Sequence, residues 1–311
     1  MAIEELLKRQ TRELDRITLS EIRRLGPLLR SSRDRLRDRL DAWLKRETPA
    51  YLQRRGIEQT DRWTAQHSRS VLAQLEAALQ STGGDLAGLL QEGGTRADAA
   101  AVEHWTALTR EAEKQFGEGL SARVDLRSVL RISEENGTLL ERYAVDSTKW
   151  TARAVSQTKQ ILAQAVLEQS PISEIVDRLS GDDGPLMGRR WDALRLVRTE
   201  FAHRYNERAI EGMQAAAEDT PDMRKRLITP LDARTATDSL MIIAAAGNIV
   251  RPINEPFDDP YWGRTFMYPP NRPNDRSRVV MWRVAWGEAG GSDRKRAGEL
   301  LASRGKAAEA A

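Results

Sequence analysis

The residues that could do chemistry gather in two short segments near the C-terminal end of the sequence. The first, D-A-R-T-A-T-D-S over Asp232–Ser239, has the turn residues and the length of a metal-binding or disulfide knuckle. Ala236 and Ser239 stand where such a knuckle would carry a C-x-x-C pair. The second segment, Y-P-P-N-R-P-N-D-R-S-R, places Asp275 and Ser277 at the spacing of a C-x-C pair. The sequence therefore has the frame of two knuckles without their sulfur ligands.

Sulfur chemistry is excluded throughout the chain, because its 311 residues include no cysteine. A disulfide framework, a thiolate metal site and a cysteine nucleophile are all ruled out on this ground. The histidines His67, His104 and His203 lie far apart and lack the H-x-x-x-H and H-x-x-E-H spacings. We expect them to be surface residues or to be satisfied by hydrogen bonds, and we expect no metal and no cofactor.

Motifs for phosphate binding and acyl transfer are also missing from the sequence. The one Gly-Lys pair, Gly305-Lys306, has no upstream glycine at the Walker offset, and no G-x-S-x-G elbow occurs. The polar cluster Arg198-Thr199-Glu200 lies in a predicted helix, where its first and third side chains project about 200° apart. We therefore expect no enzyme activity, and we expect capping, salt bridges or loop contacts from this cluster.

Upstream of these segments, the periodicity of apolar residues predicts a helical body. Apolar residues recur at helical intervals from residue 3 to about 44, with an interruption expected near Gly26-Pro27. A second amphipathic pattern covers residues 63–79. The two Gly-Gly pairs within residues 81–98 are expected to form loops.

The helical pattern continues through the middle of the chain. It resumes over residues 99–117, whereas residues 119–133 fit either a connector or a pairing surface. Residues 136–179 predict two helices, the second opening at Pro171 with Ser170 as its N-cap. A further helix is expected from Arg189 to Ala217. Its apolar face should carry Trp191, Leu194, Val197, Phe201 and Tyr205.

The character of the sequence changes after Thr220-Pro221, where Pro, Gly, Asn and Asp become frequent. The short apolar runs R-L-I-T, M-I-I-A-A and S-R-V-V-M-W-R-V-A-W predict strands. We predict a mainly α-helical protein with an elongated helical body and a small α+β C-terminal domain. Its expected parts are an N-terminal helical region over 1–130, a helical core over 131–218, a strand- and loop-rich domain over 219–286, and a flexible tail over 287–311.

The charge balance alone points to no particular partner, because 49 Lys and Arg residues stand against 46 Asp and Glu residues. Charged residues make up 31% of the chain and aromatics 5%, which is typical of solvated helices with narrow apolar seams. In S-S-R-D-R-L-R-D-R-L, arginines and aspartates alternate and can pair along a helix. This face is either a solvated helix surface or a surface for DNA or an acidic partner. Its candidate nucleic-acid contacts are Arg33, Arg35, Arg37 and Arg39.

A membrane partner is not expected. The sequence has no run of 18 apolar residues, and its first residues, M-A-I-E-E-L-L-K-R-Q, have a charged helical pattern unlike a signal peptide.

The order of the segments resembles the phage Mu F-like minor head protein, or head-morphogenesis, family. That family's pattern is A-R-T-E followed by N on a helix, a short strand, D-x-R-T-C-x-x-C, and P-P-x-H-P-N-C-R-C. Here the chain reads V-R-T-E-F-A-H-R-Y-N, then R-L-I-T-P-L-D-A-R-T-A-T-D-S, then P-P-N-R-P-N-D-R-S, and the resemblance covers about residues 131–285. The positions that match the family pattern are Arg198, Thr199, Glu200, Asn206, Asp232, Arg234, Thr235, Pro269, Pro270, Pro273, Asn274 and Arg276.

The departures from the family pattern fall together on its ligand positions. Ala236 and Ser239 replace the first cysteine pair, Asp275 and Ser277 the second, and Arg272 the histidine. Replacing every ligand allows ordinary hydrogen bonds and packing to hold the same turns, whereas replacing one would leave unsatisfied remnants. We therefore expect the frame to persist because the fold and its contacts are needed.

The resemblance implies a minor head component of a tailed phage or phage-derived particle, present in several copies near the portal vertex. Its implied role is docking on the portal and assisting head assembly or DNA packaging and delivery. The implied partners are the portal protein, together with the major capsid protein and packaged DNA as further candidates. The implied location is the virion, assembled in the bacterial host cytoplasm.

Two other interpretations stay open at this point. One is an ADP-ribosyltransferase-like enzyme, for which an Arg, Ser/Thr and Glu set would be the minimum. The other is a DNA-binding internal virion protein, suggested by the arginines of the N-terminal region.

Overall fold

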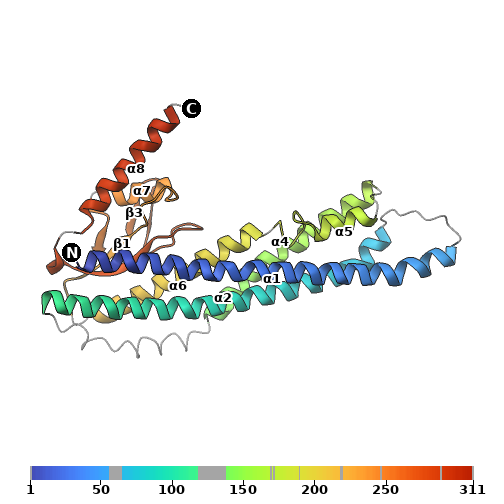
Figure 1. Cartoon of the computed structure of the whole chain (residues 1–311), viewed down its shortest axis with the longest axis horizontal. Helices are drawn as coiled ribbons and strands as arrows, with labels where there is room; N and C mark the ends of the chain where they lie inside the picture. The colour runs from blue at the N-terminus through green and yellow to red at the C-terminus, as the bar shows by residue number, and fades with distance from the viewer. Residues whose placement is uncertain are drawn as a thin grey trace. The chain divides into compact units, whose positions relative to one another are not determined.

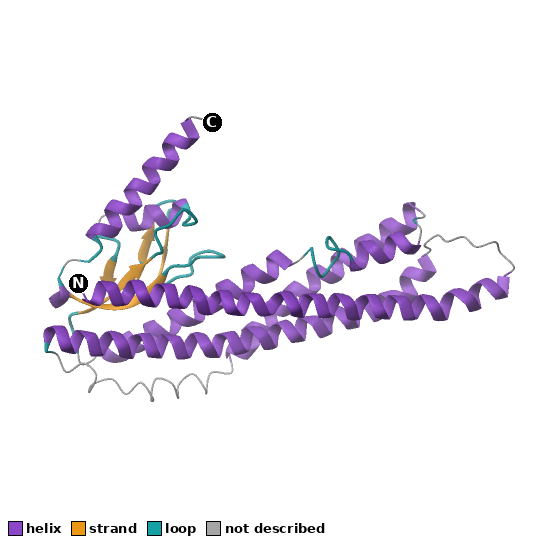
Figure 2. Ribbon diagram, viewed as in Figure 1, coloured by secondary structure: helices purple, strands orange, loops and turns teal. Residues whose placement is uncertain are grey.

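The computed structural model describes residues 2–55, 65–117, 138–168, 170, 172–188, 190–217, 220–245, 247–287 and 289–309. These residues form a mainly α-helical protein with a small α+β region near the C-terminus, which confirms the predicted fold class (Figures 1 and 2). The chain divides into two compact units, neither of which is continuous in sequence. One unit holds Met1–Leu19, Glu92–Gly137 and Arg198–Ala311, and the other holds Ser20–Gln91 and Thr138–Val197.

Two long helices, α1 (Ala2–Arg55) and α2 (Ala65–Phe116), contribute to both units. The break expected at Gly26-Pro27 and the loops expected at the Gly-Gly pairs are absent from these helices, and both predictions were wrong. Leu25 and Leu29, on either side of the Gly-Pro pair, are fully buried. Burying these two leucines contributes about 3–6 kcal/mol, whereas a glycine and a proline in a helix interior cost about 1 and about 3 kcal/mol, so packing can offset the local preference.

The second unit contains helices and the turn segment 181–188 but no strand among its described residues. Parts of α1 and α2 pack with α4 (Thr138–Glu168), α5 (Ile172–Ser180) and the first turns of α6 (Arg190–Ala217). Its core includes Leu29, Leu36, Leu75, Leu86, Trp150, Leu162, Ile175 and Leu194. Pro171 was predicted to open the helix that corresponds to α5, and it lies outside the described residues. The connector predicted at residues 119–133 also lies outside them.

The first unit contains the sheet. Strands β1 (Met223–Ile228), β2 (Val250–Pro252) and β5 (Arg278–Arg283) form an antiparallel sheet in the order β2-β1-β5. Strands β3 (Phe257–Asp259) and β4 (Arg264–Phe266) form a separate hairpin, and the short 3-10 helix η1 (Val284–Trp286) follows β5. The strand predicted at R-L-I-T is confirmed by β1. The run S-R-V-V-M-W-R-V-A-W forms β5 over Arg278–Arg283, whereas its last three residues form η1.

Two further predictions in this region were wrong. M-I-I-A-A belongs to helix α7 (Thr237–Ala244), and the segment expected as a flexible tail forms helix α8 over Gly291–Glu309. A five-residue apolar run does not distinguish a strand from a buried helix, and here α7 packs against α8. Ala297, Leu300 and Leu301 of α8 join the same core as α7, which explains why this polar segment is helical.

Candidate functional site

The two knuckle segments are joined by a bidentate ion pair. Arg276 donates from Nη1 to Asp232 Oδ2 at 2.9 Å and from Nη2 to Asp232 Oδ1 at 2.6 Å. Arg276 also lies 3.8 Å from a carboxylate oxygen of Asp15 on α1. The hydrogen bonds from Arg276 hold the pKa of Asp232 well below its usual range, and the positive charge of Arg276 adds to this effect. Both residues are family-motif positions, 44 residues apart in sequence.

The first loop is closed by its own side chains. Asp232 Oδ1 accepts the backbone N–H of Arg234 at 2.9 Å, and the Thr235 hydroxyl accepts the N–H of Asp232 at 3.0 Å while donating to the Pro230 carbonyl. Arg304 on α8 donates to the carbonyls of the same loop. The D-x-R-T sequence is thus a self-bonded turn, in which the Arg234 side chain is exposed.

Polar groups also connect the positions that carry metal ligands in the family pattern. Arg272 donates from Nη2 to Ser239 Oγ at 2.9 Å and forms an ion pair from Nε to Asp238 Oδ2 at 2.6 Å. Ser277 Oγ donates to Asp275 Oδ1 at 2.7 Å. Four of the five positions therefore have a side-chain hydrogen-bond partner, and a cation, Arg272, stands where the family has a neutral histidine ligand. Ala236 is half-buried directly before α7.

Helix α6 holds the second loop through two motif residues. Asn206 Oδ1 accepts the backbone N–H of Val279 at 2.6 Å, and its Nδ2 donates to the Ser277 carbonyl at 3.3 Å. Thr199 Oγ1 accepts the backbone N–H of Asn274 at 3.2 Å. Asn206 is fully buried, and its amide satisfies the outer edge of β5 as a neighbouring strand would.

The other motif residues lie on the same helix and loops. Glu200 is buried and Arg198 is half-buried on α6; the idea that they hold this helix to the 232–234 turn stays a prediction. Pro270 is half-buried and Pro273 is exposed in the second loop. The hydrogen bonds given above reach residues 274–279 rather than that turn.

Sequence reasoning missed a buried row of hydrogen-bonded side chains formed by Arg278, Tyr205 and His104. Arg278 Nη1 donates to the Tyr205 hydroxyl at 3.3 Å, and that hydroxyl lies 2.9 Å from His104 Nδ1. A carboxylate can only accept a hydrogen bond, so the neutral His104 ring carries its proton on Nε2, 3.4 Å from Glu13 Oε2, and the Tyr205 hydroxyl donates to Nδ1. Burial, aided by the charge of Arg278, lowers the pKa of His104 to about 3. The one signal in the sequence is Arg278, directly before the apolar run V-V-M-W.

The expectation that the histidines are surface or satisfied residues therefore holds for His104, and His203 is half-buried against Tyr268. The side chain of His67 lies outside the described residues.

The candidate nucleic-acid contacts form a mixed, partly paired surface on α1. Arg33 pairs with Asp34 at 3.1 Å and lies 3.7 Å from Asp182, and Arg35 pairs with Asp85 at 2.7 Å. Arg37 and Arg39 are exposed. This pattern agrees with a solvated helix face, and DNA contact stays a prediction.

Within the described ranges, no group of three or more acidic or histidine side chains is placed to hold a metal ion. No helix among the described residues is long and apolar enough to cross a membrane. Comparison of the chain with family models, curated proteins and solved structures found no match.

Proposed function

We propose that the protein is a minor head component of a tailed-phage or phage-derived particle that docks at the portal vertex and assists head assembly or DNA packaging and delivery. The observation that carries this proposal is the meeting of three sequence segments. The loops around Asp232 and Arg276 are joined by an ion pair, and α6 binds the second loop through Thr199 and Asn206. These are the segments on which the family resemblance rests, and an accidental likeness gives no reason for them to be adjacent.

The ion pairs of Asp232, Arg276 and Arg272 are typical of a structural role, in which they hold the two knuckle segments together. Both carboxylate oxygens of Asp232 accept hydrogen bonds from Arg276, and Arg272 is paired with Asp238 and Ser239. Bidentate arginine–carboxylate pairs fix geometry because two parallel bonds allow only one orientation. We therefore propose docking rather than turnover of a substrate, with the Asp232–Arg276 ion pair keeping the C-terminal domain in shape.

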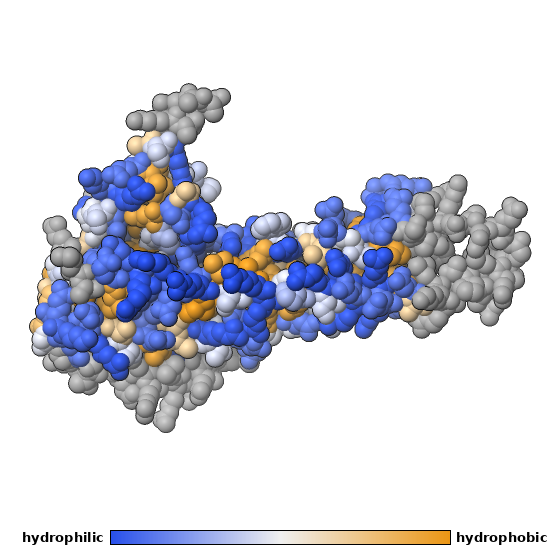
Figure 3. All heavy atoms as spheres, in the orientation of Figure 1, coloured by the Kyte–Doolittle hydropathy of each residue, from blue (hydrophilic) through white to orange (hydrophobic). Residues whose placement is uncertain are grey.

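The helical unit offers a surface suited to a partner helix. A groove of about 580 Å³ lies between α2 and α4, and its apolar lining includes Leu72, Leu162 and Leu167. Leu167 is 84% exposed at its edge, although most of the large apolar side chains of this unit are buried within it. On the face drawn in Figure 3, apolar residues likewise form small patches between hydrophilic ones. Grooves of this kind take the apolar face of an amphipathic helix, and we propose that a portal helix fills this one.

Co-expression with a portal protein from the same genome tests the proposal. We expect wild-type chain to elute with assembled portal on size exclusion, and Leu167→Glu to elute separately because it places a charge in the apolar groove. Gln160→Glu, at an exposed position of the same helix, is the matched control and should still co-elute. If wild-type chain elutes apart from portal, and particles built without portal incorporate it at the normal level, docking at the portal is wrong.

Activity with NAD separates this proposal from the enzyme alternative. A docking protein should transfer no label from NAD to candidate targets. Labelling that is lost in Glu200→Gln, with the fold unchanged, would replace the proposal by the ADP-ribosyltransferase interpretation.

A further inference from the structure

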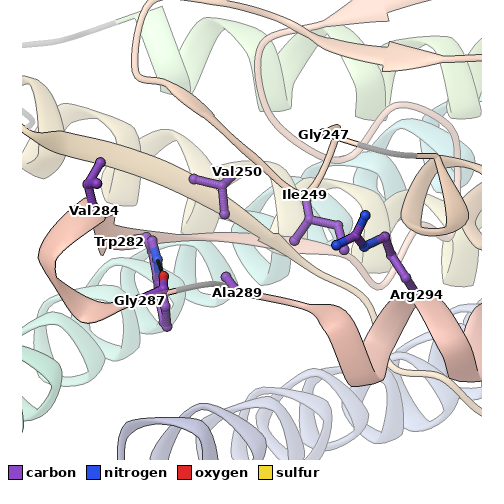
Figure 4. Close-up of a pocket in the computed structure, with 8 residues that line it drawn as sticks. All are labelled: Gly247, Ile249, Val250, Trp282, Val284, Gly287, Ala289 and Arg294. Carbon is purple, nitrogen blue, oxygen red and sulfur yellow. Dashed lines mark hydrogen bonds between the residues drawn. The ribbon is translucent and has the colours of Figure 1, made fainter.

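A second pocket lies in the sheet-bearing unit, beside the end of β5. It has a volume of about 440 Å³ and is lined by the loop between α7 and β2, by β2, β5, η1 and the loop that follows, and by α8. In Figure 4, the guanidinium of Arg294 lies beside Ile249 at one end, and Val284, Trp282 and Gly287 lie at the other. Of the described residues that line it, Arg294 alone carries a charge. The pocket is thus apolar with one cationic end.

The β3–β4 hairpin presents two aromatic rings to solvent. Tyr261 is 50% exposed and Trp262 is 60% exposed, and their rings meet edge to face with centroids 4.9 Å apart. A tryptophan exposed to this extent on a tight turn is a typical anchor of a protein interface.

The turn at the tip of this hairpin is fixed by hydrogen bonds to the side chain of Asp259. The buried carboxylate of Asp259 accepts the backbone N–H groups of Tyr261 and Trp262 at 3.2 and 3.3 Å. Its second oxygen accepts a hydrogen bond from Asn271 at 3.0 Å and pairs with Arg264 at 3.3 Å. The two rings therefore stand on a preorganised turn, which lowers the entropy lost when they bind.

The charges around the tip favour a protein partner over a nucleic acid. Arg264 pairs with Asp259, and Arg251 pairs with the exposed Asp258, so these two arginines of the hairpin region are already matched by carboxylates. Binding to a single strand requires a positively charged groove beside the stacking rings.

We infer that the Tyr261-Trp262 tip of one copy inserts into the Ile249–Trp282–Arg294 pocket of a second copy. A cavity of about 150 Å³ already accommodates benzene, so a pocket of about 440 Å³ has room for an indole ring and its neighbour. The Arg294 guanidinium can lie over the face of the incoming indole, and the apolar walls cover its edge. The tip is exposed in its own chain, so its own pocket does not take it.

The geometry of such a contact is head to tail. Tip and pocket are different surfaces, so each bound copy leaves one tip and one pocket free for the next, and the assembly closes into a ring or continues as a chain. Tyr261 and Trp262 are 50% and 60% exposed, so from their side they can bury only about half of the roughly 300–500 Å² of two aromatic side chains, which places the contact in the weak class. A weak contact repeated around several copies gains strength from the others.

Sedimentation velocity on the full chain without portal tests the inference independently of portal docking. We expect wild-type protein to form species larger than a dimer as its concentration rises. Trp262→Ala, which removes the tip, and Ala289→Trp, which fills the pocket, should each stay monomeric. Trp191→Ala removes another exposed tryptophan, on α6, and should associate as wild type does.

Mixing the two variants gives the decisive result. An equal mixture of Trp262→Ala and Ala289→Trp holds one intact pocket and one intact tip, so it should form a species of two chains and nothing larger. Val284→Glu, at an exposed pocket residue, replaces Ala289→Trp if that variant melts early. The inference is overturned if wild type stays monomeric, if Trp262→Ala associates normally, if the mixture fails to pair, or if the tip instead binds single-stranded DNA.

Discussion

Asn206 on α6 binds the backbone of Val279 on β5 in the way a neighbouring strand would. Its Oδ1 accepts the Val279 N–H at 2.6 Å, and its Nδ2 donates both to the Ser277 carbonyl at 3.3 Å and to the Ala202 carbonyl of its own helix at 2.8 Å. One buried amide thus satisfies the strand edge and links the motif helix to the second knuckle loop. Only a side chain with both a donor and an acceptor can do this.

Replacing Asn206 by leucine should destabilise the protein by about 1–3 kcal/mol, because the buried N–H of Val279 then lacks a partner. Urea unfolding followed by circular dichroism measures this difference. Gln214→Leu, at an exposed position of the same helix, is the control and should change stability by no more than about 0.5 kcal/mol. Equal stabilities of the two variants would contradict a role for Asn206 in holding β5.

The Asp232–Arg276 pair predicts a pH dependence at the acid end. The folded-state pKa of Asp232 is depressed, so its contribution is fully present above the unfolded value of about 3.9 and is lost as pH falls through the folded value. Since the Asp232 side chain is 41% exposed, solvent screening limits this contribution to about 1 kcal/mol.

Asp232→Asn should therefore be less stable than wild type at neutral pH, and the gap should narrow progressively below about pH 4. Thermal melts across this range give the measurement. Asp34→Asn, which breaks an exposed pair on α1, serves for comparison. A gap that stays constant down to strongly acidic pH would contradict the assignment to this carboxylate.

Protonation of His104 should destabilise the fold. The pKa of His104 is lowered to about 3, below the unfolded value of about 6.5, so stability is fully present above pH 6.5 and falls as pH drops towards 3. In this window the unfolded chain binds a proton that the folded chain excludes.

His104→Asn keeps an acceptor near the Tyr205 hydroxyl and removes the titrating ring. We expect this variant to lose less stability than wild type between pH 6.5 and pH 3, by on the order of a few kcal/mol. Unfolding at fixed pH steps tests it, with His203→Asn, a half-buried histidine on α6, as control. Parallel pH profiles for wild type and His104→Asn would refute the buried neutral state.

Metal removal should leave the C-terminal domain intact. Arg272 occupies the family's histidine position, and its positive charge, bound to Asp238 and Ser239, opposes a divalent cation there. A chelator should not change the melting temperature, and elemental analysis should find no stoichiometric zinc. Stoichiometric zinc in purified protein would show that other residues supply the ligands.

Local pattern was reliable where one periodicity dominates a long segment. The helices α4, α5 and α6 and the strands β1 and β5 were predicted close to where they lie. It failed at α7, at the two Gly-Gly pairs and at α8, because burial against distant segments decided the conformation there. Trp191 illustrates the same limit, since periodicity assigned it to the apolar face of α6 and it is 77% exposed.

The sequence by itself determined which classes of chemistry are excluded and in which order the motif segments follow one another along the chain. Absence of cysteine removes thiolate sites, and the D-x-R-T and P-N-x-R spacings mark the two turns because they depend on neighbouring residues alone. The tertiary structure decided the pairings: Asp232 with Arg276, Asn206 with Val279, and Tyr205 between His104 and Arg278. These contacts join residues 44 to 101 positions apart, and only burial, which makes an unpaired polar group costly, selects among the partners that the sequence allows.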